Sequence, residues 1–182
     1  AARERLHLRR VSYEGYRRAD GLYDIEARLT DSKDRDYPLA GGTRSKDIPV
    51  HDMLVRVTID RRFEVIDIEA TTEEMPYPGQ CNKIGPDYKK LIGSNLLKGF
   101  RKVIAEKMGG VKGCTHLSEL LGYLPTAAVQ TFAGRMLPLQ QVVACSEIAG
   151  VTSPLISTTA RPPLGSVDIV AALRSEEHTS EL

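Results

Sequence analysis

Apolar and polar residues alternate along the first part of the chain. Residues 6–18 mix apolar, aromatic and basic side chains in rough alternation, and residues 22–29 alternate more regularly. A period of two is typical of a β-strand that buries one face. The dipeptide Asp20-Gly21 lies between the two runs, and Asp-Gly favours a hairpin turn because Gly adopts positive φ without strain. Residues 6–29 therefore predict a first β-hairpin.

A second alternating pair follows a polar stretch. Residues 30–47 contain Pro38, Gly41 and Gly42 and predict a long loop. Residues 53–59 and 63–69 each alternate at period two around a short polar turn, which predicts a second hairpin. The side chains expected to face the core are Leu54 or Val55 with Val57, Ile59, Val65 and Ile68.

Helical periodicity replaces this alternation further along the chain. Residues 86–93 and 99–108 predict two short helices, and residues 115–121 and 125–143 predict two more, with Gly122 ending the first of these. Pro125 lies where a proline in the first turn of a helix is tolerated. The whole pattern predicts an α+β fold, in which an antiparallel sheet of about four strands, built from two hairpins, packs against a C-terminal helical half.

The organisation of the chain follows from the same pattern. With 182 residues the chain is expected to form one α+β domain over residues 1–150, followed by a loop-rich or disordered tail over residues 151–173. Residues 174–182, RSEEHTSEL, resemble the in-frame translation of a sequencing adapter, and we treat them as an artefact.

Composition and charge narrow the classes of function. The formal net charge is +1, which provides no general attraction to nucleic acid, and none is expected as a partner. No apolar run approaches the ~18 residues that a membrane span requires, so no membrane association is expected. The three cysteines are few and far apart, which fits a reducing compartment, and we expect a cytoplasmic protein.

Several sequence motifs in a fixed order resemble those of a known family. They are YEGYRRADGLYDIEARLTDSK, IPVHDMLVRVTID, PYPGQC, LIG, LLKGFRK, GGVKGCTHLSELLG and LPTAAVQT. Together they resemble a bacterial domain-of-unknown-function family, number 2889, from about residue 9 to residue 131. The resemblance implies no established activity, and the role of Cys145 stays open.

The tetrapeptide GCTH, residues 113–116, is the first candidate for chemistry. A Cys and a His two positions apart reach one point when a helix starts between them, and free amide groups at a helix start favour a thiolate. Cys114 and His116 are therefore candidate metal ligands. The alternative to metal binding is that Cys114 acts as a small buried apolar residue and that the side chain of His116 is partly exposed.

Further candidate ligands precede this motif in turns. Cys81 follows a proline-rich turn, and His51 and Asp52 stand at the start of an expected strand. With Cys114 and His116 they form a mixed S, N and O set that suits Zn or an iron-sulphur site. The order of elements is also similar to that of iron-sulphur cluster assembly scaffolds, which implies the same role for Cys81, Cys114 and His116. Alternatively, Asp52 pairs with an arginine.

Two other functions remain open from the sequence. In a thiol-dependent enzyme, Cys114 would be the nucleophile, His116 or His51 the base, and Asp52 the group that orients the histidine. In an interaction or dimerisation module, the apolar residues between 126 and 143 would either pack in the core or form a homodimer.

Overall fold

The computed structural model describes residues 1–39, 41–76 and 83–133. Cys81, Cys145 and the stretches 151–173 and 174–182 lie outside these ranges, as does the part of the expected domain from residue 134 to residue 150. The expected division of the chain after residue 150 therefore stays a prediction.

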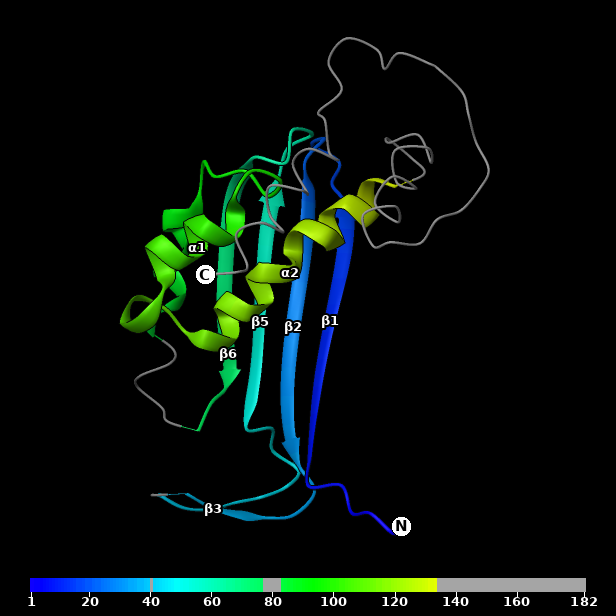
Figure 1. Cartoon of the computed structure of the whole chain (residues 1–182), viewed down its shortest axis with the longest axis vertical. Helices are drawn as coiled ribbons and strands as arrows, with labels where there is room; N and C mark the ends of the chain where they lie inside the picture. The colour runs from blue at the N-terminus through cyan, green and yellow to red at the C-terminus, as the bar shows by residue number, and fades with distance from the viewer. Residues whose placement is uncertain (40, 77–82, 134–182) are drawn as a thin grey trace.

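Four antiparallel strands form the main sheet, as the alternating pattern predicted. They are β1 (His7–Arg17), β2 (Tyr23–Lys33), β5 (His51–Ile59) and β6 (Val65–Glu74), and their order in the sheet follows the chain. Each pair of neighbours is antiparallel, so the two expected hairpins lie side by side (Figure 1). The core-facing side chains in the second hairpin include Val55, Val57, Ile59, Val65 and Ile68, which resolves the choice between Leu54 and Val55.

The expected loop over residues 30–47 contains more structure than its composition indicates. Strand β2 continues to Lys33, and a small separate hairpin follows, made of β3 (Tyr37–Leu39) and β4 (Gly42–Arg44). The guanidinium of Arg44 donates hydrogen bonds to the backbone oxygens of Pro49 and Met75, and it also pairs with Glu74. One side chain thereby fastens this polar hairpin to the end of β6.

The helical half follows the sheet along the chain. It consists of the 3-10 helix η2 (Gly85–Leu91), α1 (Phe100–Met108), the short 3-10 turn η3 (Gly110–Lys112) and α2 (Thr115–Phe132). The prediction of two separate helices on either side of Gly122 is wrong, because α2 is continuous and carries Pro125 in its interior. Burial explains the continuity: Leu117, Leu120, Leu121, Leu124, Ala128 and Val129 form one apolar face.

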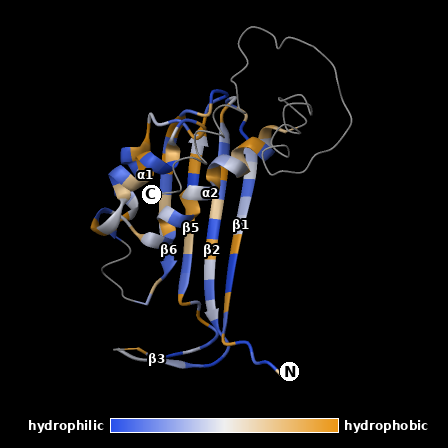
Figure 2. Ribbon diagram, viewed as in Figure 1, coloured by the Kyte–Doolittle hydropathy of each residue, from blue (hydrophilic) through white to orange (hydrophobic). Residues whose placement is uncertain are grey.

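The described helices all lie on one face of the sheet. Helix α2 contacts β1, β2 and β5, and its buried face packs on the inward side chains of the strands (Figure 1). Hydropathy alternates along the strands in Figure 2, and the outward positions carry ion pairs such as Arg28 with Asp52 and Arg56 with Glu69. The core is therefore a single layer between the sheet and α2, α1 and η2.

Helix α2 approaches β1 closely at one point. A Cβ atom on Gly15 would lie 1.8 Å from Oγ1 of Thr131, so only a glycine fits beneath the helix there. Glycine permits this close approach because it has no side chain. Across the described ranges, no helix is both long enough and apolar enough to span a membrane.

Candidate functional site

A row of polar side chains crosses three strands on the helix-covered face of the sheet. Arg9 of β1 is opposite Asp31 of β2, and Asp31 is opposite His51 of β5. Residues directly opposite on antiparallel strands have Cβ atoms about 5 Å apart, so their side chains interact. The strand periodicity thus brings together an arginine, a carboxylate and an imidazole at one end of the apolar core.

Asp31 is the centre of this row. Its carboxylate accepts two hydrogen bonds from Arg9, at 2.8 Å from Nε to Oδ1 and at 2.9 Å from Nη2 to Oδ2. It also accepts one from Nε2 of His7 at 2.9 Å and one from Nδ1 of His51 at 3.0 Å. Only 3% of Asp31 is exposed, and a buried carboxylate needs such partners to remain charged.

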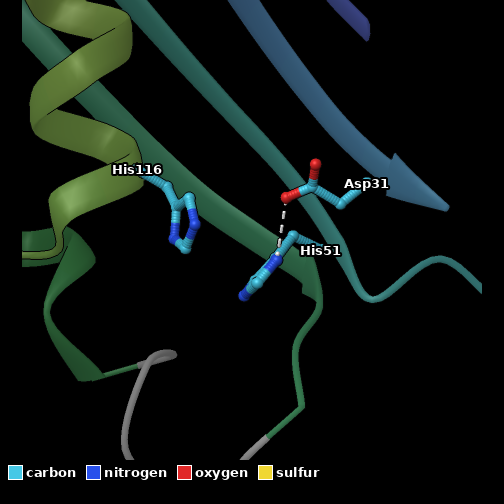
Figure 3. Close-up of side chains that lie close together, drawn as sticks. All are labelled: Asp31, His51 and His116. Atoms are coloured by element: carbon cyan, nitrogen blue, oxygen red, sulfur yellow. Dashed lines mark hydrogen bonds and ion pairs between the residues drawn. The ribbon is translucent and has the colours of Figure 1, made fainter. Parts of the chain in front are cut away.

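Helix α2 brings a third imidazole to the same place. His116, in the first turn of α2, lies against His51, with 4.1 Å between the ring centroids and 41° between the ring planes. Figure 3 shows the His116 ring extending from α2 toward the His51 ring, and His51 bonded to Asp31. Ligand atoms of Asp31, His51 and His116 all lie within 4.8 Å of one another.

The pKa of Asp31 is held well below its ordinary value. Burial by itself would raise this pKa, but the hydrogen bonds from Arg9, His7 and His51 and the charge of Arg9 outweigh burial. Asp31 is therefore an ionised hydrogen-bond acceptor at neutral pH. The ring nitrogens that face it, Nε2 of His7 and Nδ1 of His51, must carry the protons in these bonds.

His116 has the opposite tendency. Burial lowers its pKa, and the nearby charges of His51 and Arg9 lower it further, so His116 is neutral at pH 7. Its carboxylate neighbour Glu119 accepts a hydrogen bond from Nη1 of Arg9 at 3.3 Å. Asp31 and Glu119 place two carboxylates beside the single guanidinium of Arg9, and this excess of carboxylates favours a cation.

The structure brings together two of the five ligands proposed from the sequence. His51 and His116 are in contact, although they are far apart along the chain. Asp52 follows His51 on β5 and therefore points to the opposite face of the sheet. There it forms two hydrogen bonds with Arg28, at 2.9 Å and 2.7 Å, as the arginine alternative expected.

Cys114 precedes α2 and is not a member of the group of ligand atoms formed by Asp31, His51 and His116. Its side chain is partly buried and packs against the apolar core. Its backbone N–H donates to the hydroxyl of Tyr88 at 3.0 Å, and that hydroxyl donates to the carbonyl of Cys114 at 3.0 Å. Cys81, the remaining proposed ligand, lies outside the described residues.

Comparison with protein-family models supplies the relationship of the chain to other proteins. Residues 7–130 match a family described as protein of unknown function (DUF2889), and the match covers more than half of the chain. The chain belongs to the DUF2889 family. The matched range contains Asp31, His51 and His116, so the candidate site lies within the DUF2889 domain. No curated protein and no solved structure matches this DUF2889 chain.

Three residues of the DUF2889 site were not found from the sequence: His7, Arg9 and Asp31. Asp31 was missed because the expected strand ended at residue 29. Extending its alternation by one step places Asp31 on the buried face, and an inward carboxylate at the end of an apolar strand is a signal of a polar site. The same alternation distinguishes inward His51 from outward Asp52.

Proposed function

We propose that this DUF2889 domain binds a divalent transition metal, Zn²⁺ in particular, through the imidazoles of His51 and His116. The observation that carries the proposal is the clustering of ligand atoms from Asp31, His51 and His116 within 4.8 Å. Imidazole nitrogen is a preferred donor for Zn²⁺, and a site with two histidines leaves positions for water or other donors.

Asp31 is assigned to hold His51 and not to contact the metal. Both of its oxygens already accept hydrogen bonds from Arg9, and one of them also accepts from His51. Because Nδ1 of His51 donates this bond, Nε2 keeps its lone pair and is the nitrogen that would bind the metal. A carboxylate that holds a ligand histidine in this way is common at zinc sites and makes the imidazole a better donor.

The protonation state of His116 also supports the proposal. A histidine must be neutral to bind a metal, and burial lowers the pKa of His116. Protons therefore compete with the metal at this ligand only below neutral pH. The side chain of His51 is 15% exposed, so the pair is sheltered but not sealed from solvent.

The donors that are described favour zinc over an iron-sulphur cluster. The group consists of nitrogen and oxygen donors, whereas clusters are held mainly by thiolates. The side chain of Cys114 packs against the core, so we base the proposal on the histidines and not on a thiol nucleophile. Cys81 stays a proposed additional ligand from the sequence.

Isothermal titration of the chelator-treated protein with ZnCl₂ tests the proposal. We expect saturable binding, and substitution with Co²⁺ is expected to give visible absorption bands from nitrogen-bound cobalt. His51→Gln and His116→Gln should each weaken binding by roughly tenfold or more. Wild-type protein that does not bind Zn²⁺, or a His116→Gln variant that binds as tightly as wild type, would overturn the proposal.

Matched controls separate the site from nonspecific binding. Asp52→Asn removes a carboxylate adjacent in sequence to His51 but on the other face of the sheet, and it should leave the affinity unchanged. Cys114→Ser should also leave it unchanged. A weaker affinity in Cys81→Ser, with Cys114→Ser unaffected, would add one thiolate to the two histidines.

A further inference from the structure

The two edges of the main sheet differ in how they are covered. At β6, the segment between η2 and α1 hydrogen-bonds to the edge of the strand. The N–H of Val65 donates to the carbonyl of Ser94, and the N–H of Gly93 donates to the carbonyl of Val65. At β1, the other edge strand, no described segment pairs with the side that faces away from β2. Figure 1 shows β1 as the outer strand of the sheet, and within residues 1–39, 41–76 and 83–133 its outer backbone groups have no partner strand.

Apolar side chains accompany this open edge. Val11 is 46% exposed and Tyr16 is 45% exposed, in the middle and near the end of β1. A long edge strand with exposed apolar residues is a surface on which another strand can pair. A groove of about 590 Å³ beside it, on the helix-covered face, is lined by Tyr13, Gly15, Tyr123 and Thr131 among others.

We propose that β1 pairs antiparallel with β1 of a second copy of this chain, with the two-fold axis at Ser12. In this register Arg10 of each copy is opposite Glu14 of the other, which forms the same ion pair twice. Leu8 is opposite Tyr16 on the outward face. Val11 is opposite Tyr13 on the inward face, where the second copy's Val11 enters the groove.

Charge selects this register over its neighbours. With the axis at Tyr13, Arg9 would be opposite Arg17, and like charges opposite one another are destabilising. With the axis at Val11, Arg10 would be opposite Ser12 and the complementary pair would be lost. The side chain of Arg10 forms no ion pair with any residue in the described part of the chain, so it is available to pair with Glu14 of the second copy.

A charge swap tests the pairing in the full chain. Sedimentation over a range of concentrations is expected to show a dimer of the wild-type protein. Arg10→Glu and Glu14→Arg should each weaken the dimer at least about tenfold, because each places like charges opposite one another twice. The double variant Arg10→Glu/Glu14→Arg should restore the dimer. Lys102→Glu and Glu106→Arg make the same charge changes on exposed positions of α1 and should leave the dimer unchanged.

Cysteine cross-linking reports the register itself. In a background where the native cysteines are serine, Ser12→Cys should form a disulfide-linked dimer under mild oxidation, because the two thiols face each other at the axis. Arg10→Cys should not, since the two residues lie four positions apart in register, about 13 Å along the strands.

The possible outcomes decide the proposal. A protein that is monomeric at every concentration overturns it, as does a dimer that survives both single charge reversals. A double variant no more dimeric than the single variants, or equal cross-linking of Ser12→Cys and Arg10→Cys, overturns the register and with it this pairing.

Discussion

Asp31 and His51 lie opposite each other on β2 and β5, and Oδ2 of Asp31 accepts a hydrogen bond from Nδ1 of His51 at 3.0 Å. The bond fixes the tautomer of His51, because an ionised carboxylate accepts and does not donate. His116 of α2 lies against the same ring, with the two ring planes tilted by 41°. The row of Arg9, Asp31 and His51 across the sheet therefore contacts the first turn of α2 through His116. The orientation of His51 in this contact depends on the charge of Asp31.

Replacing Asp31 by Asn tests this dependence. The amide keeps the shape but loses the charge that balances Arg9, and we expect the free energy of unfolding to fall by about 1–3 kcal/mol. Arg9 is partly exposed, so its unpaired charge remains partly solvated, which keeps the loss below that of a fully buried pair. Urea denaturation measures the change.

The control for Asp31→Asn is Asp52→Asn. Asp52 also pairs with an arginine, Arg28, but that side chain is 56% exposed and the pair lies on the solvent face. An exposed pair contributes about 1 kcal/mol or less. Equal losses in the two variants would show that the buried row has no special role in stability.

The pH dependence of stability should report His116. Burial lowers its pKa below the ordinary 6.5 in the folded state, so the unfolded state takes up the proton first as the pH falls. The stabilisation from a neutral His116 is thus fully present above about pH 6.5 and is lost as the pH falls through the folded pKa. Denaturation of His116→Gln between pH 8 and pH 5 should show a shallower decline than wild type.

The same experiment has a clear contrary result. Parallel curves for wild type and His116→Gln would mean that this imidazole titrates alike in the folded and unfolded states. Zn²⁺ affinity of the wild-type protein should fall over the same pH interval, because protons compete for the same nitrogen.

The contact of Gly15 with α2 predicts a steric effect. Gly15→Ala places a Cβ atom 1.8 Å from Oγ1 of Thr131, so α2 or β1 must move, and overpacking of this kind costs about 1–3 kcal/mol. Thermal and urea denaturation should both show the loss. Adding Thr131→Ala removes the nearest atom and should recover part of it.

Gly122→Ala is the matched control for the Gly15 substitution. Gly122 lies inside α2, and a Cβ atom there would meet nothing within 4 Å. Alanine in a helix interior is favoured over glycine by about 1 kcal/mol, so this variant should be more stable than wild type. Destabilisation by both substitutions would argue against the close approach at Gly15.

Tyr88 connects η2 to the start of α2. Its buried hydroxyl bonds the backbone N–H and carbonyl of Cys114, and it is 3.3 Å from the hydroxyl of Ser118. Tyr88→Phe leaves the Cys114 backbone groups without this partner and should cost about 1–2 kcal/mol of unfolding free energy. Tyr123→Phe, at a residue 61% exposed, should change stability little. Similar losses in both variants would contradict this role.

Much of the fold was predictable because it depends on local periodicity. The alternation over residues 6–29 and 53–69 identified the four strands and their hairpin pairing, since neighbouring strands joined by tight turns pair with each other. The prediction of a break in the last helix was wrong, because it relied on two single residues and not on the apolar periodicity of the whole segment. Gly122 and Pro125 indicated a break in the last helix, but the continuous apolar face of α2 is buried and outweighs both.

The sequence by itself determined the α+β class, the two hairpins, the family and the candidacy of His51 and His116. Only the tertiary structure decided which candidates meet. Asp52 is turned to the solvent face by the pleat of β5, and Cys114 packs against the core, whereas His116 reaches His51 because α2 begins above that strand. Asp31 became the centre of the site because two strand pairings place Arg9 and His51 on either side of it. Such meetings depend on register and on how the helix packs, and neither is encoded in a local pattern.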